Sequence, residues 1–118
     1  MLTKKRRLSK EEINRVKEEG RLWSTPLFSL LYLKGLDSPS KFAFILSKRV
    51  SKKAVERNHA KRILAGATRQ LIKKIREGYW IVFLVKKEAL KQKRSQVDPI
   101  IKKAFIKIGL LKENRENS

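Results

Sequence analysis

Cysteine is absent from this chain of 118 residues, which excludes a disulfide scaffold and a thiolate metal site and fits a reducing compartment. A single histidine, His59, has no second imidazole to join, so we expect the polypeptide itself to hold no metal and no other cofactor. No apolar run approaches the length of a membrane span, and the Lys- and Arg-rich start lacks the apolar segment of a signal peptide. These absences predict a small cytoplasmic protein without membrane contact.

Acidic side chains are also scarce: Asp and Glu number 11 against 31 Lys and Arg, which leaves a formal net charge of +20. Such a charge opposes compaction through self-repulsion and calls for a polyanionic partner. Hydrophobic residues still make up 41% of the chain and fall in periodic blocks, enough for one modest core. We predict a single domain over residues 1–118, with an ordered core at about 6–110 and a flexible basic N-terminus and C-terminal tail.

Three apolar runs predict strands. Residues 27–33 and 42–47 are apolar and aromatic, and the short connection between them contains Gly, Asp and Pro, which favours an antiparallel hairpin. Residues 80–85 are apolar on both alternating faces, as expected of an interior strand that is covered on both sides. Trp80 is therefore interpreted as a core residue, whereas Trp23 falls in a polar loop, where packing and stacking on a base are equally favoured.

Two helical segments have clear ends. Ser9 and Glu12 form the pattern of a capping box, and Gly20 ends the short helix that follows them. Apolar residues spaced three and four apart predict a long helix over residues 54–76, which Gly78 ends.

A third helix follows the last strand. It opens at Ser95 or Asp98, with Pro99 just inside, and ends before Gly109. The resulting order, α-β-β-α-β-α, predicts an α+β fold, a single-domain sandwich of helices on a small mixed sheet.

The stretch from Lys48 to Arg62 is the most informative part of the chain. It holds seven Lys and Arg in fifteen residues and runs from the end of a predicted strand into the long helix. A basic run this dense is usually either a disordered tail or one face of a folded nucleic-acid binder. The flanking strand and helix favour a rigid surface that faces phosphates.

On a helical wheel, the outer side of the long helix is cationic. That side holds Asn58, Arg62, Arg69, Lys73 and Arg76, with Arg57 and Lys61 flanking the apolar stripe and Ala65 and Gly66 leaving room for a close backbone approach. A merely solvated face is the alternative, but it predicts interspersed acids, and Glu56 is the only acid between residues 48 and 76. The functional interpretation requires Arg62 and Arg69 to point outward without carboxylate partners.

The basic stretch has a recognisable spacing. Lys48-Arg49 is followed by Ala54-Val55-Glu56-Arg57-Asn58-His59-Ala60-Lys61-Arg62, and Arg69 comes one helical stretch later. This arrangement resembles the Ala-x-x-Arg-Asn-Arg-x-Lys-Arg signature of the protein subunit of bacterial ribonuclease P. The element order also agrees from about residue 6 to residue 110, so spacing, strand and helix match together.

The resemblance implies an RNA-binding subunit of a ribonucleoprotein endoribonuclease. In that family a catalytic RNA, acting with Mg²⁺, removes the 5′ leader from precursor tRNA, and the protein supplies no catalytic residue. The expected partners are therefore the RNA subunit and precursor tRNA, with one protein monomer in a 1:1 complex and Mg²⁺ bound through the RNA. The family fold, shared with a ribosomal protein domain, also implies a left-handed crossover between parallel strands, although such crossovers are right-handed in about 98% of cases.

Carried onto matching positions, the resemblance assigns two groups of residues. The expected RNA-binding residues are Lys48, Arg49, Lys52, Lys53, Arg57, Asn58, His59, Lys61, Arg62, Arg69 and Lys73. The expected leader cleft comprises Ile13, Lys17, Phe28 and Leu31. His59 replaces an arginine of the signature and adds pH sensitivity, while Ile13 and Lys17 replace aromatic residues and weaken base stacking.

Two other functions are alternatives. A ribosomal or general RNA-binding protein explains the charge and the fold class equally well, but not the spacing of the basic motif. A metal-dependent protein nuclease requires an acidic cluster, which the sequence lacks. There is also no Ser/His/Asp or Cys/His set and no Gly-rich phosphate loop, so the polypeptide alone shows no catalytic machinery.

Overall fold

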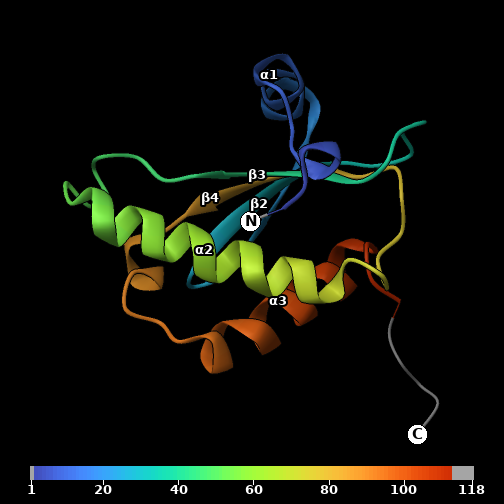
Figure 1. Cartoon of the computed structure of the whole chain (residues 1–118). Coiled ribbons are helices and arrows are strands. Elements are labelled where there is room, and N and C mark those ends of the chain that lie inside the picture. Colours follow the sequence, from blue (N-terminus) through green and yellow to red (C-terminus); the bar gives the residue numbers. More distant parts are fainter. Residues whose placement is uncertain (1, 113–118) are drawn as a thin grey trace, which may run out of the picture.

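The computed structural model describes residues 2–112, which form one four-stranded sheet with helices on both faces (Figure 1). The helices are α1 (Lys10–Glu19), α2 (Ala54–Leu71) and α3 (Arg94–Ile108), with short 3-10 helices η1 (Lys4–Arg6) and η2 (Lys87–Ala89). The strands are β1 (Arg21–Ser24), β2 (Phe28–Leu33), β3 (Lys41–Ile45) and β4 (Trp80–Val85). The predicted α+β sandwich with a small mixed sheet is confirmed.

The strands lie in the order β1-β2-β4-β3, so neighbours in the chain are not always neighbours in the sheet. β2 pairs antiparallel with β1 and with β4, and β3 pairs in parallel with β4. The predicted antiparallel hairpin of residues 27–33 and 42–47 is therefore wrong, because β4 lies between these two strands. β4 is the interior strand that the sequence predicts: Val82 and Phe83 point to opposite faces and both are fully buried.

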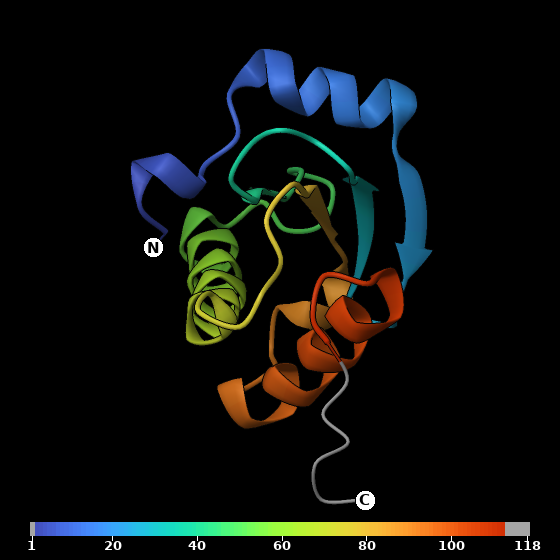
Figure 2. The same cartoon turned by 90° about the vertical axis from the view of Figure 1, so that its right-hand side faces the viewer.

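The sheet separates two unequal layers (Figures 1 and 2). α2 and α3 pack beside each other on one face, whereas α1 crosses part of the other face over β2 and β4. The connection β3–α2–β4 joins two neighbouring parallel strands, as the resemblance implies. The left-handed sense of that crossover stays a prediction.

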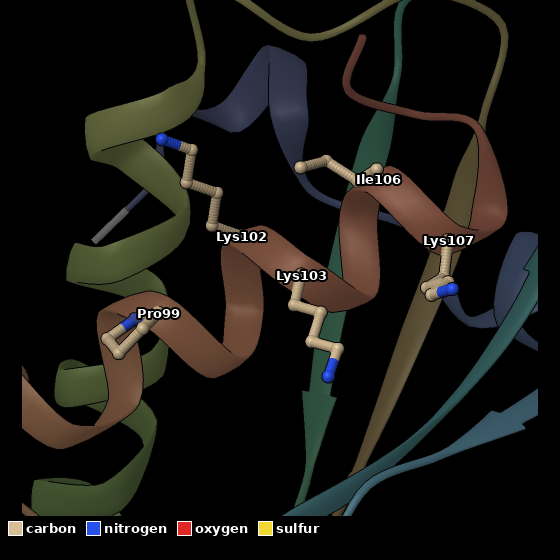
Figure 3. A pocket seen from close by; sticks show the side chains of 5 residues that line it. All are labelled: Pro99, Lys102, Lys103, Ile106 and Lys107. Carbon is tan, nitrogen blue, oxygen red and sulfur yellow. The ribbon is translucent and has the colours of Figure 1, made fainter. Parts of the chain in front are cut away.

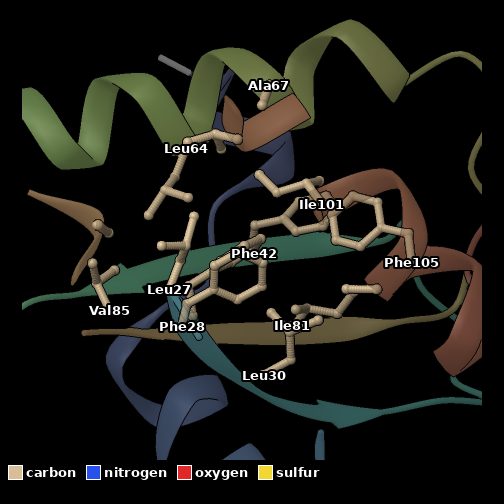
Figure 4. Close-up of a cluster of buried hydrophobic side chains, with 14 of the residues drawn as sticks. Leu27, Phe28, Leu30, Phe42, Leu64, Ala67, Ile81, Val85, Ile101 and Phe105 are labelled. Atoms are coloured by element: carbon tan, nitrogen blue, oxygen red, sulfur yellow. The ribbon is translucent and has the colours of Figure 1, made fainter. Parts of the chain in front are cut away.

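The main core lies between the sheet and the layer formed by α2 and α3 (Figure 4). Four phenylalanine rings form its centre. The Phe28 and Phe83 ring centroids are 5.0 Å apart, and the Phe105 ring lies 6.1 Å from both Phe42 and Phe83. Leu64 of α2 closes this cluster from above the sheet, so the apolar stripe of the long helix faces inward as predicted.

α1 begins and ends where the sequence predicts. The Ser9 hydroxyl accepts a hydrogen bond from the Glu12 backbone N–H (3.2 Å), and the Glu12 carboxylate accepts one from the Ser9 N–H (2.8 Å). This is the predicted capping box. Gly20 ends the helix, and its N–H donates to the Val16 carbonyl. Val16, fully buried, is the side chain through which α1 packs on the sheet.

α2 is shorter than predicted: it ends at Leu71, and Gly78 does not end it. The apolar spacing continues to Ile75 because Ile75 also packs against the core. Ile75 lies outside the helix, however, where its backbone forms an isolated bridge with Leu111. Gly78 instead precedes β4 with φ at +90°, and a Cβ at this position would lie only 2.7 Å from the Leu36 carbonyl oxygen. A side chain here would clash with backbone, so glycine is required by the turn.

α3 begins before the predicted positions. Its N-cap residue is Lys93, so neither Ser95 nor Asp98 caps the helix, and Pro99 lies inside it rather than in its first turn. Gly109 adopts a left-handed conformation directly after the last turn and ends α3 as predicted.

Residues 21–24, predicted as a polar loop, form the edge strand β1. All four side chains are exposed, among them Leu22 and Trp23. The prediction failed because an exposed edge strand need not alternate apolar and polar residues.

The N-terminal segment is part of the fold. Leu2 is buried, and the Arg6 guanidinium donates to the Glu77 carboxylate (2.6 Å) and to the Ser40 carbonyl (3.1 Å). The buried Ser40 hydroxyl in turn accepts from the Tyr79 N–H (3.0 Å). Order therefore begins before residue 6, in contrast to the predicted flexible N-terminus, and the predicted flexible C-terminal tail lies outside the described residues.

Candidate nucleic-acid interface

The loop between β3 and α2 is basic and is tied to the first turn of α2. The Ser51 hydroxyl donates to the Glu56 carboxylate (2.6 Å) and accepts from the Lys53 N–H (3.1 Å). The Arg57 guanidinium donates to the Ser51 carbonyl (2.7 Å). Glu56, in the first turn, also lies where the helix dipole favours a negative charge. The only acid of this region therefore holds the loop in place.

The residues predicted to bind RNA lie on this loop, on α2 and, in the case of Lys73, in the turn after α2. We call the predicted set the α2 basic surface; it comprises Lys48, Arg49, Lys52, Lys53, Arg57, Asn58, His59, Lys61, Arg62, Arg69 and Lys73. Arg57 and Lys61 are half-buried and the other nine are exposed. Arg57 is partly committed to the loop, so it positions the surface as well as adding charge to it.

No residue of the α2 basic surface forms an ion pair with another described residue. The four ion pairs found within residues 2–112 involve Arg6, Arg15, Lys41 and Arg94. Arg62 and Arg69 are exposed and have no carboxylate partner among the described residues, as the functional interpretation requires. Uncompensated charge of one sign destabilises a compact protein, so a surface of this kind is built for an anionic partner.

Ala65 and Gly66 do not offer the open backbone that the helical wheel predicts. Ala65 is 1% exposed, and the Arg94 guanidinium of α3 lies only 2.6 Å from the position of a Cβ on Gly66. The prediction was wrong because α2 is covered on more than one side: Arg94 also donates to Gln70, one turn further along the helix (2.8 Å).

A second candidate surface lies on the sheet face that α1 covers only in part. Val82 of β4 points to this face and is fully buried, but apolar side chains around it are half-buried; we call four of them, Leu31, Ala43, Ile45 and Leu84, the open sheet face. Leu84 pairs with Ile45, and the basic loop leaves β3 directly after Ile45. The apolar open sheet face and the basic loop between β3 and α2 are therefore adjacent.

The predicted cleft residues are only partly brought together. Leu31 lies on the open sheet face, and Ile13 and Lys17 belong to α1, with Ile13 half-buried and Lys17 exposed. Phe28 is fully buried against Phe83, so its assignment to the cleft is wrong. Residues three apart in a strand point to opposite faces, so Phe28 and Leu31 cannot share one surface.

The sequence analysis missed Ala43, Ile45 and Leu84. A signal was available, because strand parity relative to Phe42 and Phe83 places these side chains on the face opposite the core. The missing information was strand order: only with β4 between β2 and β3 do the three side chains lie on one sheet face with Leu31.

α1 is held beside the open sheet face by polar contacts. The Lys41 ammonium donates to the Glu12 carboxylate (3.0 Å) and lies 5.9 Å from the centre of the Trp80 ring, while the Arg15 guanidinium lies 5.5 Å from the same ring. Burial alone raises the pKa of Glu12, but hydrogen bonds from Ser9 and Lys41 outweigh it and hold that pKa below its ordinary value. Trp80 is thus half-buried beside two cations, and the prediction that it is a core residue is wrong.

Residues 2–112 contain no group of three or more His, Cys, Asp or Glu side chains placed to hold a metal ion. In the same part of the chain, no helix has the length and apolar character needed to cross a bilayer. Several acids of the described region form contacts within the fold. The pKa of Glu77, for example, lies below its ordinary value because the Arg6 guanidinium and the Ser40 N–H donate to its carboxylate.

Comparison with protein families places this surface in context. The family model described as Ribonuclease P matches residues 2–109. The ribonuclease P protein component of Dehalococcoides mccartyi is 33% identical over 113 residues, which are 95% of this chain and 92% of that protein. The corresponding protein of Chloroflexus aurantiacus is 33% identical over 76 residues, which are 64% of this chain and only 56% of that protein's length.

Solved structures share the fold at lower identity. The ribonuclease P protein of Staphylococcus aureus has a TM-score of 0.78 at 15% identity, covering 90% of this chain and 97% of that one. The ribonuclease P protein of Thermotoga maritima has a TM-score of 0.71 at 21% identity, covering 80% and 90%. These similarities support the arrangement of helices on the mixed sheet described above.

Proposed function

The chain belongs to the ribonuclease P protein family, and from this premise we propose that it is the RNA-binding protein component of a ribonucleoprotein endoribonuclease that removes the 5′ leader from precursor tRNA. Its partners in this proposal are the catalytic RNA subunit and precursor tRNA, with one protein for each RNA. The complex would work in the cytoplasm.

The α2 basic surface is the observation that carries the proposal. Nine of its members are exposed, and none is paired with a carboxylate of the described residues. Lys and Arg side chains held in this way neutralise phosphates and release the counterions condensed on RNA. If the surface covers six to ten phosphates, binding should weaken roughly 10³–10⁵-fold between about 50 and 200 mM salt.

The open sheet face is the proposed site for the single-stranded leader. Leu31, Ala43, Ile45 and Leu84 offer a half-buried apolar floor, and the basic loop supplies charge at its border. Single strands bind where cations follow the backbone and bases meet an apolar or aromatic surface. This floor is aliphatic, so it lacks the ring stacking that gives about 1–3 kcal/mol per base, and the leader should be held mainly through its phosphates.

The cleavage chemistry is assigned to the RNA. The described residues do not supply a ligand set for Mg²⁺, which prefers several carboxylate and phosphate oxygens, so in this proposal the metal is held by RNA phosphates. The polypeptide contributes positive charge, which lowers the repulsion between RNA strands and so favours a folded, metal-binding RNA.

The test is reconstitution of precursor-tRNA cleavage with a bacterial ribonuclease P RNA at a magnesium concentration where that RNA alone is inactive. The wild-type chain should restore cleavage. Arg62→Ala should need more protein for the same rate, whereas Lys34→Ala, which removes an exposed cation outside both candidate surfaces, should behave like wild type.

A ribosomal or general RNA-binding protein predicts a different outcome. Such a protein would bind the RNA through its charge but would give no stimulation at low magnesium. Cleavage of RNA by the purified polypeptide without any RNA subunit would point instead to a protein nuclease. Either result would overturn the proposal.

A further inference from the structure

A second cluster of cations lies outside the α2 basic surface, on the exposed side of α3 (Figure 3). Lys102, Lys103 and Lys107, which we call the α3 lysine surface, surround a shallow hollow of about 550 Å³ with Pro99 and Ile106. Lys102 extends toward α2, while Lys103 and Lys107 extend away from it (Figure 3). All three ammonium groups belong to exposed residues.

The α3 lysine surface is not explained by contacts within the described chain. None of its lysines forms an ion pair there, and the only acid of α3, Asp98, binds Arg94 instead (2.9 Å). Lys103 and Lys107 are one turn apart, an arrangement in which like charges destabilise a helix. Lys107 alone lies in the last turn, where the helix dipole favours a cation. Lys102 and Lys103 have no such compensation.

The α3 lysine surface continues onto α2 through a groove between the two helices. This second hollow, of about 220 Å³, is lined by Lys74, which follows α2, and by Lys102 of α3, together with Gln70, Asp98 and Pro99. Of the α2 basic surface, Arg69 lies in the last turn of α2 and Lys73 lies in the turn that follows the helix. Lysines therefore border the groove on both sides, and Asp98, the acid in its lining, is paired with Arg94.

The chemistry of this surface fits phosphates better than a lipid bilayer or an apolar protein interface. α3 buries Val97, Ile101, Phe105 and Ile108 in the core, and its other large apolar side chains, Ile100 and Ile106, are half-buried. The large exposed hydrophobic residues of the described chain, Leu22, Trp23 and Val55, all lie outside α3. A helix that binds at a membrane surface presents such residues outward. Lysines without aromatic or arginine neighbours act as point charges, which contact backbones and do not read bases.

We propose that the α3 lysine surface binds the phosphate backbone of a second RNA segment, at the same time as the α2 basic surface binds the first. The inference rests on the proposed RNA-binding function and deepens it: the protein would bridge two segments of the catalytic RNA. The RNA partner would be recognised by backbone shape and charge, without sequence preference at this surface.

The test compares two charge-matched variants of the full chain. One carries Lys102→Gln, Lys103→Gln and Lys107→Gln. The control carries Lys5→Gln, Lys34→Gln and Lys87→Gln, three exposed lysines on η1, on the turn after β2 and on η2. Both variants lose three charges, so a difference between them reports on position and not on net charge. Equal thermal unfolding midpoints would establish that both are folded.

Affinity for a bacterial ribonuclease P RNA is then measured against salt concentration. Loss of three phosphate contacts should lower the slope of log K against log salt by about two to three in the α3 variant. The control should change the slope by less than one. Nuclease protection of the RNA should be lost in one segment with the α3 variant and in a different segment with Arg62→Ala.

Equal slopes of log K against log salt for the two triple variants would overturn the α3 proposal. The proposal would also fail if the α3 variant and Arg62→Ala lost nuclease protection in the same RNA segment. Anionic phospholipid vesicles provide a further arm: binding of wild type that the α3 variant loses, with unchanged RNA affinity, would assign the surface to a membrane. Failure of the proposed function has a separate signature, because wild type itself would then show no stimulation of the RNA.

Discussion

The two faces of the sheet are held in different ways. On one face, α2 and α3 bury a continuous aromatic and aliphatic core around Phe28, Phe83 and Phe105. On the other, α1 makes one fully buried apolar contact through Val16 and otherwise relies on the Lys41–Glu12 pair and the cations around Trp80. Hydrophobic burial gives far more free energy than exposed or half-exposed ion pairs. The first face therefore contributes most of the stability of the fold, and the second is the face that we propose for the leader.

The largest expected effect is a difference in unfolding free energy between substitutions on the two faces of the sheet. Phe28→Ala should lower the free energy of unfolding by about 3–5 kcal/mol, because it leaves a cavity between sheet and helices. Leu31→Ala, on the opposite face of the same strand, should cost much less, since Leu31 is only half-buried. Urea denaturation of the two variants measures both values. Similar losses would mean that the open sheet face is part of the core.

A smaller effect is expected on ligand binding. Leu31→Glu places a negative charge on the open sheet face, so affinity for precursor tRNA should fall about tenfold, equivalent to about 1.4 kcal/mol. Affinity for mature tRNA, which has no leader, should be unchanged. Binding of both RNAs to the reconstituted complex, with Lys34→Glu as the control for net charge, distinguishes a leader site from general repulsion.

The attachment of α1 should show a still smaller effect. Lys41→Met keeps an apolar stem but removes the ammonium that binds Glu12 and approaches Trp80, at a cost of about 0.5–1.5 kcal/mol. The loss should be local, so backbone amides of α1 should exchange faster with solvent than those of α2. Uniform acceleration across the chain would instead show that α1 and the core open together.

The pH dependence of stability is the weakest of these expectations. The pKa values of Glu12 and Glu77 lie below the ordinary value of 4.5, so between the folded and unfolded values the unfolded state binds more protons. Their contribution is complete above about pH 4.5 and is lost as the pH falls through the folded values. The variant Glu12→Gln/Glu77→Gln should therefore be less stable than wild type at about pH 7 and should approach it in acid.

The sequence correctly predicted those features of the fold that depend on residues close together in the chain. The Ser9 capping box, Gly20, Gly109 and the apolar stripe of α2 are each set by contacts within a turn or two. The outward direction of Arg62 and Arg69 followed from the same stripe, because burying one side of a helix fixes the other. The cationic interface was therefore largely predictable.

Features that depend on distant parts of the chain were not predictable in this way. The position of β4 between β2 and β3 decides which side chains share a face, and no local pattern contains it. The burial of Ala65 depends on tertiary packing, which a helical wheel of α2 alone does not show. The end of α2 was placed too late because Ile75, which forms a bridge with Leu111, continues the apolar spacing beyond the helix. Strand order and helix neighbours thus account for the main errors.

The central claim is that Arg62 and Arg69 of α2 are exposed for RNA and contribute nothing to the fold. The most direct measurement is RNA affinity and unfolding free energy for one variant, Arg62→Glu/Arg69→Glu. Affinity for the ribonuclease P RNA should fall at least about 100-fold, because two charges then repel phosphates, while stability should stay within about 0.5 kcal/mol of wild type. A folded variant that binds the RNA as tightly as wild type would contradict the account.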